Sequence, residues 1–449
     1  MPNVKRPPGP KGHFLLGVLP EVRREDVKFA TRMAREYGDI VFFRVVNIPT
    51  YLISHPRYIE EGLVTNYRNF LKAIYLRESR ALFGEGLLTS DGEVWVRERR
   101  MGQRAFRHEH IDTYASTIVS HTERKLAEWQ AGDTRDVHQE MMRLTLEIIA
   151  RVLFGRELAD ELEDATAAIN VYLEQFADRF GMYAVPEWIP TPGNVRYRRA
   201  MKRLDSIIYD AIREGRDSRG EEQSLLAAFL RAQQFYGFEL TDKQLRDEMA
   251  TLFFTGHETT GLALTWTLFL LGEHPEAEAK LQEELDAVLG GRSAGLADIP
   301  RLPYLDCVIK ESLRLYPPAY GVVREALNDC EIGGYTVPKG STVATFQWVM
   351  HRDPRFFDDP ESFRPERWAD GLAERLPKFA YFPFGGAPRI CIGKDFALLE
   401  TALVLATIMR RFRFRTVAGH RTWPLPSLTL RPEYGMKMVL HNRAAVPVH

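Results

Sequence analysis

The feature that most constrains this chain is a long helical pattern over residues 242–273, which at 1.5 Å per residue would be about 48 Å long. Thr241 followed by Gln244 fits the capping box that begins a helix, and His274-Pro275 ends it. The middle of the pattern is apolar on all sides, which is typical of a helix buried in a core. The sequence therefore predicts a protein built around one long central helix.

Polar residues interrupt this helix at Gly256-His257-Glu258-Thr259-Thr260-Gly261. Glycine, a carboxylic acid and threonine are unfavourable in a buried helix interior, and such local violations are most frequent at functional sites. We expect a distortion of the helix at Gly256 and a polar site beside it.

The rest of the chain also favours helix over strand. Helical periodicity extends over 25–37, 92–107, 111–131, 138–154, 158–180, 191–214, 275–289, 303–315 and 393–412. Strand patterns occupy Ile40–Val45, Thr50–Ser54, Glu331–Val337, Thr342–Thr345 and parts of 412–441. The predicted fold class is mainly α, with a small β region drawn mainly from 38–55, 320–345 and 412–441.

Composition narrows the functional classes. With 60 Lys and Arg against 61 Asp and Glu, the net charge is −1, so no overall field favours nucleic acid as a partner. Cys307, Cys330 and Cys391 form an odd and sparse set, which argues for a reducing compartment. No apolar run reaches the roughly 18 residues of a membrane span. We expect a cytoplasmic protein without a membrane span.

Two common catalytic motifs fail on inspection. His257-Glu258 begins a zinc-protease motif, but Gly261 occupies the position of the second histidine. Gly291-Arg-Ser-Ala-Gly295 matches a hydrolase nucleophile elbow, which requires a strand before it and a helix after it. Here a predicted helix precedes the motif and a loop follows, so hydrolase chemistry is not favoured.

One segment carries a more specific signal, Phe384-Gly385-Gly386-Ala387-Pro388-Arg389-Ile390-Cys391-Ile392-Gly393. It delivers a single cysteine to the start of the predicted helix 393–412. The free N–H groups and positive dipole at a helix start stabilise a thiolate. Arg389 can meet an anionic group, and glycines such as Gly385 and Gly393 let the backbone approach a flat ligand closely.

This segment resembles the haem-binding loop of the cytochrome P-450 monooxygenases, in which the cysteine thiolate is the axial iron ligand. The resemblance implies haem b as cofactor, with Cys391 on the iron, Phe384 beside the sulfur and Arg389 on a haem propionate. Ala387 departs from the family pattern, which usually has a second glycine there. The resemblance covers essentially the full chain, 1–449, as one cytochrome P-450 domain with the long helix over the haem.

Three further motifs follow the family's order. Glu311 and Arg314 lie on one helix face and, with Arg367, match the family's structural Glu-x-x-Arg and arginine set. Thr259 matches the threonine that contacts dioxygen, and Glu258 matches the acid that feeds protons toward it. Thr255 departs from the family's usual Ala or Gly.

Trp95, Arg99 and Arg324 match the remaining propionate contacts of the family. The resemblance thus implies a monooxygenase that inserts one atom of O2 into a lipophilic substrate by hydroxylation or epoxidation. A peroxygenase that uses hydrogen peroxide, and a non-catalytic haem sensor or carrier, are the alternatives. The acid and threonine at 258–259 argue against both, because neither alternative needs a proton relay.

Two apolar, aromatic stretches, about 70–88 and 168–190, are expected to roof the substrate pocket. Phe70, Tyr75, Leu76, Leu82, Phe83, Tyr172, Phe176, Phe180, Met182, Tyr183 and Trp188 are the candidate lining residues. They favour a fatty acid, terpenoid or steroid as the substrate.

A basic stripe is predicted on the helix 92–107. With Trp95 at zero and about 100° per residue, Arg99 falls near 40°, on the same face. Arg97, Arg100, Arg104 and Arg107 fall between about 120° and 200° on that count. In the family this helix borders the surface where redox partners dock. We therefore expect an acidic ferredoxin or flavodoxin, separate from this chain, as the electron donor.

Overall fold

The central helix forms where the sequence predicts it. The computed structural model describes residues 5–25, 27–106, 112–158, 161–179, 188–217, 224–236, 240–386 and 388–443. Helix α13 occupies Asp242–Glu273. The N–H of Gln244 donates to Thr241 Oγ1 at 3.2 Å, and the N–H of Thr241 donates to Gln244 Oε1 at 3.0 Å. The predicted capping box and the end at His274 are confirmed.

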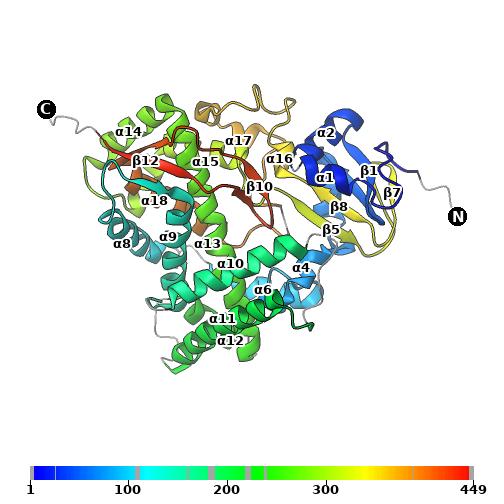
Figure 1. Cartoon of the computed structure of the whole chain (residues 1–449), viewed down its shortest axis with the longest axis horizontal. Helices are drawn as coiled ribbons and strands as arrows, with labels where there is room; N and C mark the ends of the chain where they lie inside the picture. The colour runs from blue at the N-terminus through cyan, green and yellow to red at the C-terminus, as the bar shows by residue number, and fades with distance from the viewer. Residues whose placement is uncertain are drawn as a thin grey trace. The chain divides into compact units, whose positions relative to one another are not determined.

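The glycines of α13 admit a neighbouring helix instead of distorting their own. Residues 242–273 are α-helical throughout, so the expected distortion at Gly256 is wrong. A Cβ atom at Gly256 would lie 2.9 Å from Ile149 Cγ1, and one at Gly261 would lie 2.8 Å from Met142 Sδ. Both neighbours belong to α9, Val137–Phe154, which lies alongside α13 (Figure 1). Glycine occurs in this buried helix because side chains of α9 occupy the space of a Cβ atom.

The chain divides into two compact units, and the first of them, Glu78–Ile309 with Ile392–His449, holds α13. Besides α9 and α13, its helices are α5 (Arg80–Phe83), α6 (Gly92–Ala105), α8 (Ala115–Leu126), α10 (Leu162–Arg179), α11 (Pro192–Asp217), α12 (Leu225–Tyr236), α14 (Pro275–Leu289) and α18 (Lys394–Met409). The long helices agree with the predicted ranges to within a few residues, except α12. The sequence did not predict α12. Its first residues are almost all buried, so they show no periodic change between apolar and polar residues.

The last strands of the chain belong to this helical unit. β12 (Lys437–Asn442) pairs with both β4 (Thr134–Asp136) and β9 (Phe412–Thr416) in an antiparallel sheet of order β4-β12-β9. β10 (Pro424–Pro426) and β11 (Leu430–Pro432) form a separate hairpin. The indole N–H of Trp266 on α13 donates to the Leu430 carbonyl at 2.9 Å. This bond holds the hairpin against the central helix.

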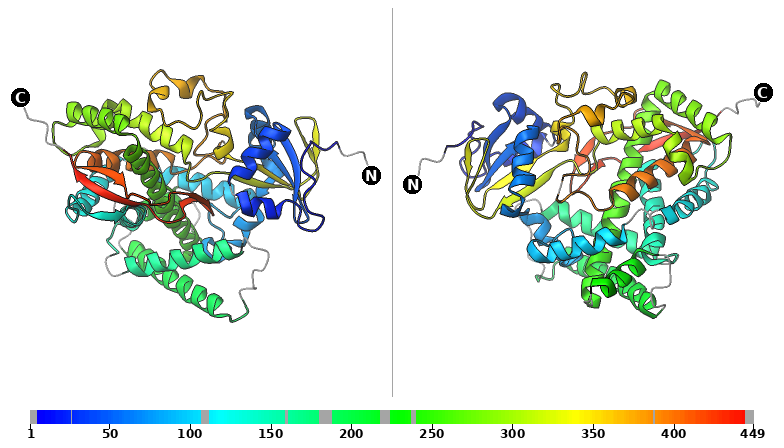
Figure 2. Two further views of the ribbon diagram at one scale, coloured as in Figure 1. Left: turned by 45° about the horizontal axis from the view of Figure 1, so that its top comes forward. Right: turned by 180° about the vertical axis from the view of Figure 1, so that it is seen from behind.

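The second unit, Met1–Arg77 with Lys310–Cys391, is built on a five-stranded mixed sheet of order β1-β2-β8-β5-β3. Its strands are β1 (Ile40–Val45), β2 (Ile48–Ile53), β3 (Phe70–Lys72), β5 (Val322–Ala326) and β8 (Thr342–Thr345). Figure 2 shows the blue N-terminal strands beside the yellow strands from the later part of the chain. Its helices are α1 (Leu19–Glu25), α2 (Val27–Tyr37), α3 (Pro56–Glu60), α16 (Gln347–Met350) and α17 (Leu372–Arg375). Two further helices, α4 (Ile74–Glu78) and α15 (Pro303–Leu315), contain the boundaries between the units.

One predicted strand is a hairpin. The pattern over Glu331–Val337 predicts a single strand, but the structure has β6 (Cys330–Ile332) and β7 (Tyr335–Val337). Gly333 and Gly334 turn the chain between them with φ of 57° and 78°. Two successive positive φ values are typical of a two-residue hairpin turn.

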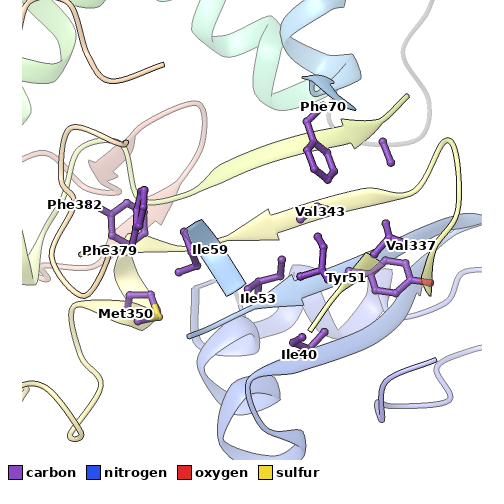
Figure 3. Packing of buried hydrophobic residues seen from close by; sticks show 12 residues of the cluster. Ile40, Tyr51, Ile53, Ile59, Phe70, Val337, Val343, Met350, Phe379 and Phe382 are labelled. Atoms are coloured by element: carbon purple, nitrogen blue, oxygen red, sulfur yellow. The ribbon is translucent and has the colours of Figure 1, made fainter. Parts of the chain in front are cut away.

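The two faces of the sheet have different cores. Ile40 and Tyr51 pack into a cluster that continues to Phe379 and Phe382, and these two phenylalanines lie at the opposite end of the cluster from Tyr51 (Figure 3). Val41, the next residue of β1, packs into a second cluster with residues of α2. Successive side chains of a strand point to opposite faces of the sheet. One face therefore packs against Phe379 and Phe382, which belong to the segment that precedes Cys391.

The predicted mainly α fold with a small β region is confirmed. Within the described ranges, no helix combines the length and the apolar character that a membrane span needs.

Glu400 of α18 generates a prediction about stability. Its side chain is fully buried beside Thr260 of α13, and burial raises the pKa of Glu400 well above its usual range. The folded state therefore binds a proton that the unfolded chain releases above about pH 4.3, so stability falls as pH rises through this window. Glu400→Gln should become more stable than the parent as pH rises from 5 to 8, by up to about 1.4 kcal/mol per pH unit.

Urea unfolding of the holoenzyme at several pH values measures this difference. Glu283→Gln at an exposed position of α14 is the control and should show no such trend. Parallel pH curves for Glu400→Gln and the parent would contradict the prediction.

Candidate active site

Backbone hydrogen bonds set the geometry of the cysteine loop. The N–H of Cys391 donates to the Phe384 carbonyl at 2.9 Å, and the N–H of Gly385 donates to the Phe382 carbonyl at 2.9 Å. Gly385 has φ of +73°, a conformation that favours glycine. Cys391 is exposed, so its thiol is accessible to a ligand.

The loop needs glycine at position 386 because an aromatic ring occupies the space of a side chain. A Cβ atom at Gly386 would lie 2.1 Å from Cε1 of Phe379, whose ring is part of the sheet core. The loop backbone therefore lies directly on this ring. Ala387, where the sequence departs from the family pattern, lies outside the described residues.

Two arginines and the loop glycines line a small pocket of this unit. Arg324 on β5 and Arg389 contribute its positive charge, and Gly385 and Gly386 contribute exposed backbone. The other lining residues are Gly62, Leu63, Tyr67, Phe70 and Val322. Two guanidinium groups beside a glycine backbone suit a carboxylate group on a flat molecule.

The start of α18 is placed by helix α6. A Cβ atom at Gly102 would lie 2.5 Å from Cδ1 of Ile392, and one at Gly393, the N-cap of α18, would lie 3.8 Å from the ring of Phe106. Glycine at 102 thus lets α6 approach the residue that follows Cys391.

The two sides of α6 are as the helical angles predict. Trp95 and Arg99 are 7% and 9% exposed, whereas Arg100 is exposed and Arg104 is half-buried. Arg97 lies 3.8 Å from a carboxylate oxygen of Glu98. Arg107, the last member of the predicted stripe, lies outside the described residues.

One strip of the central helix is open. Between Leu245 and Leu268 every residue is buried except Thr255, Gly256 and Thr259. These three positions are spaced i, i+1 and i+4, so they share one face. The hydroxyl of Thr259 donates to the Thr255 carbonyl at 2.8 Å. A ligand could therefore meet the helix at Thr259.

Glu258 is buried and has partners that the sequence did not predict. Its carboxylate is fully buried and accepts hydrogen bonds from Arg431 Nε at 2.7 Å, Arg431 Nη2 at 2.7 Å and Thr429 Oγ1 at 2.8 Å. Burial favours the neutral acid, but the Arg431 guanidinium outweighs burial and holds the pKa of Glu258 below its usual value. No local spacing could have revealed this pair, because the hydrogen bonds join residues 173 positions apart in sequence.

The three predicted structural residues meet around one carboxylate. Glu311 accepts hydrogen bonds from Arg314 Nε at 2.8 Å and Nη2 at 2.9 Å, and from Arg367 Nε at 2.9 Å. The indole N–H of Trp368 and the N–H of Arg364 also donate to it. Glu311 and Arg314 are wholly inaccessible to solvent. This cluster ties α15 to the segment that precedes the cysteine loop.

The residues predicted to roof the substrate pocket lie in different surroundings. Phe83 and Tyr172, from the two predicted stretches, both pack edge-on against Phe254 of α13, with ring centroids 5.2 and 5.5 Å away. Phe70 instead lies in the sheet core, and Trp188 is 78% exposed. Phe180, Met182 and Tyr183 lie outside the described residues.

Comparison with known proteins decides the family. The sequence profile of the family "Cytochrome P450" matches residues 7–439. The chain belongs to the cytochrome P450 family. It is 36% identical to cyclooctat-9-en-7-ol 5-monooxygenase of Streptomyces melanosporofaciens, over 90% of this chain and 88% of the relative. It is 31% identical to pentalenene oxygenase of Streptomyces avermitilis, over 88% of each.

A solved structure supports the same assignment. The retinoic-acid-bound structure of cyanobacterial CYP120A1 matches with a TM-score of 0.86 and 27% identity, over 98% of this chain and 100% of the other. The protein is therefore a haem-thiolate, O2-dependent P450 monooxygenase, and the family implies a redox partner as the source of electrons.

The residues of each unit fit a haem. The exposed cysteine, the glycine backbone on the ring of Phe379 and the arginine-lined pocket lie in one unit. The open strip of α13 lies in the other. Each feature has the chemistry that a flat, dianionic iron macrocycle requires of its protein.

The Glu311 cluster predicts a large effect of a single charge. Glu311→Gln would leave two buried guanidinium groups without their anion and should destabilise the holoenzyme by about 3–5 kcal/mol. The control is Glu174→Gln, because Glu174 pairs with Arg196 at the surface, where such a bridge contributes at most about 1 kcal/mol. Urea unfolding measures both variants, and equal losses would contradict the buried-charge explanation.

Proposed function

We propose that this P450 hydroxylates or epoxidises an olefinic terpenoid. The observation that carries the proposal is the relationship to two bacterial oxygenases whose names specify an unsaturated alcohol and pentalenene. The aromatic cluster of Phe83, Tyr172 and Phe254 supports it, because rings packed on the central helix suit a bulky apolar guest.

In this proposal the residues of the cysteine loop and its neighbours hold the haem. Cys391 is the iron ligand, and Phe384 shields the sulfur. Arg389, Arg324, Trp95 and Arg99 bind the propionates, and Gly385 and Gly393 allow the backbone to lie close to the ring. When bound, the haem supplies the oxidising chemistry, in which one atom of O2 enters the substrate and the other leaves as water.

We further propose that Thr259 and Glu258 deliver protons. The Thr259 hydroxyl is on the open strip of α13, and its hydrogen bond to the Thr255 carbonyl fixes its orientation. Glu258 is the adjacent acid, and Arg431 connects it toward the surface, since the Arg431 side chain is 20% exposed. An acid beside an oriented hydroxyl is the arrangement that proton transfer needs.

The electron donor in this proposal is an acidic ferredoxin or flavodoxin that docks on α6. Exposed Arg100 and half-buried Arg104 lie on the helix that contacts Ile392, next to the proposed iron ligand. A basic surface beside that residue favours an acidic carrier. A cytoplasmic location belongs to the same proposal, and the odd, sparse set of three cysteines supports it.

The first test concerns the iron ligand. Reduced protein with carbon monoxide should show the red-shifted Soret band of a thiolate-bound haem, and Cys391→Ala should abolish it. Cys330→Ala on strand β6 is the control and should keep the band. A persistent band in Cys391→Ala would show that another residue is the ligand.

The second test concerns the substrate. Olefinic terpenoids should convert the haem from low to high spin at micromolar concentration, because they displace water from an apolar pocket. Fatty acids of equal carbon number are the comparison ligands. A spin shift with the fatty acids and none with the terpenoids would contradict the proposed substrate class.

The third test concerns the docking surface. Arg100→Glu with Arg104→Glu should slow reduction by an acidic ferredoxin at least tenfold at low salt, and the difference should shrink as salt screens the charges. Substrate affinity should not change. Arg198→Glu with Arg199→Glu, two exposed arginines of α11, is the matched control. Stopped-flow reduction rates equal to the parent's would exclude α6 from the interface.

A further inference from the structure

The ion pair between Glu258 and Arg431 restrains the Glu258 carboxylate more than proton transfer alone would require. Both carboxylate oxygens accept from the same guanidinium at 2.7 Å, and Thr429 adds a third bond at 2.8 Å. The Glu258 side chain is 0% exposed. A bidentate, buried pair of this kind fixes both the position and the ionisation of the acid.

The strand that carries Arg431 is itself held against α13. β11 pairs with β10, and the indole N–H of Trp266 donates to the Leu430 carbonyl one residue before Arg431. Arg431 is therefore presented to Glu258 by backbone as well as by its own side chain. These contacts hold the Glu258 carboxylate on the β11 side of α13, one residue before Thr259 in sequence.

The other titratable groups near Glu258 cannot replace this cation. His257 Nε2 lies 3.9 Å from Glu258 Oε2, and burial lowers the pKa of His257. His138 of α9 faces Glu258, Arg431 and Asp136, and burial lowers the pKa of His138 to about 4. Both histidines are thus neutral near pH 7. The partner of Glu400 of α18 is Thr260, two residues after Glu258.

We propose that Arg431 is a positioning residue for proton delivery: it holds Glu258 as an anion against β11 and so sets the pH range in which Glu258 serves Thr259. This inference rests on the proposed function, in which Glu258 and Thr259 form the proton-delivery pair. A proton from solvent adds to the Glu258 carboxylate, and Glu258 then passes it to the Thr259 hydroxyl. That hydroxyl gives up its own proton to the atom of O2 that leaves as water, and Glu258 returns to the anion. Thr259 thus ends each transfer neutral.

The experiment measures two quantities as a function of pH in the holoenzyme. The first is coupling, the product formed per reductant consumed. The second is the infrared band of a protonated carboxyl group, assigned to Glu258 by its loss in Glu258→Gln. Arg431→Ala should raise the midpoint of both titrations by at least one pH unit, a tenfold change in proton affinity, because the buried acid loses its cation.

Three variants separate positioning from structural support. Arg431→Lys retains a cation and should shift the midpoint less than Arg431→Ala. Trp266→Phe removes a different link between β11 and α13 but no charge, so its midpoint should equal the parent's. In a Glu258→Gln background, Arg431→Ala should have no further effect on coupling, since Arg431 acts through Glu258.

An unchanged midpoint in Arg431→Ala, with Glu258 still ionised at pH 7, would overturn the inference. If that variant does not fold, Arg431→Lys and Thr429→Val carry the test, and unchanged midpoints in both would overturn it equally. The infrared titration needs no turnover. If the parent enzyme formed no product, the proposed function would be contradicted. The effect of Arg431 on the protonation of Glu258 could still be measured.

Discussion

The close contact between α9 and α13 determines how the central helix can function. Two glycines, Gly256 and Gly261, remove the side chains that would separate the helices, and Ile149 and Met142 occupy the space. Helix α9 thereby packs closely along α13, and between Leu245 and Leu268 the residues of α13 that stay partly open are Thr255, Gly256 and Thr259. A buried helix with one open strip is a suitable frame for chemistry, because water reaches it only where a ligand can.

Buried carboxylates with arginine partners recur in both units. Glu311 binds Arg314 with bidentate geometry and Arg367 through one hydrogen bond, and Glu258 binds Arg431 with bidentate geometry. A buried charge of this kind contributes little net stability, yet removal of one partner is costly, so the surrounding segments are confined to one arrangement. For Glu311 that arrangement supports the cysteine loop's own unit. For Glu258 it controls the side chain next to Thr259.

Much of the helical framework could be predicted because its signals are local. The capping box at Thr241 and Gln244 and the proline after His274 place both ends of α13 at the observed residues. Short strands could not be predicted in the same way. β3 and β4 have three residues each, and they are stabilised by partners far away in sequence. The hairpin at Gly333-Gly334 was missed although its glycine pair is a turn signal.

The sequence by itself determined the family and the residues that characterise it. Cys391 in its glycine loop, the Glu311 and Arg314 spacing and the 256–259 segment are contiguous patterns that a single chain displays without folding. Only the tertiary structure decided which partners these residues have. Glu258 is paired with Arg431 because a hairpin late in the chain packs on α13, and no pattern along the sequence encodes that contact. Its ionisation depends on that distant cation and on burial, which exist only in the folded protein.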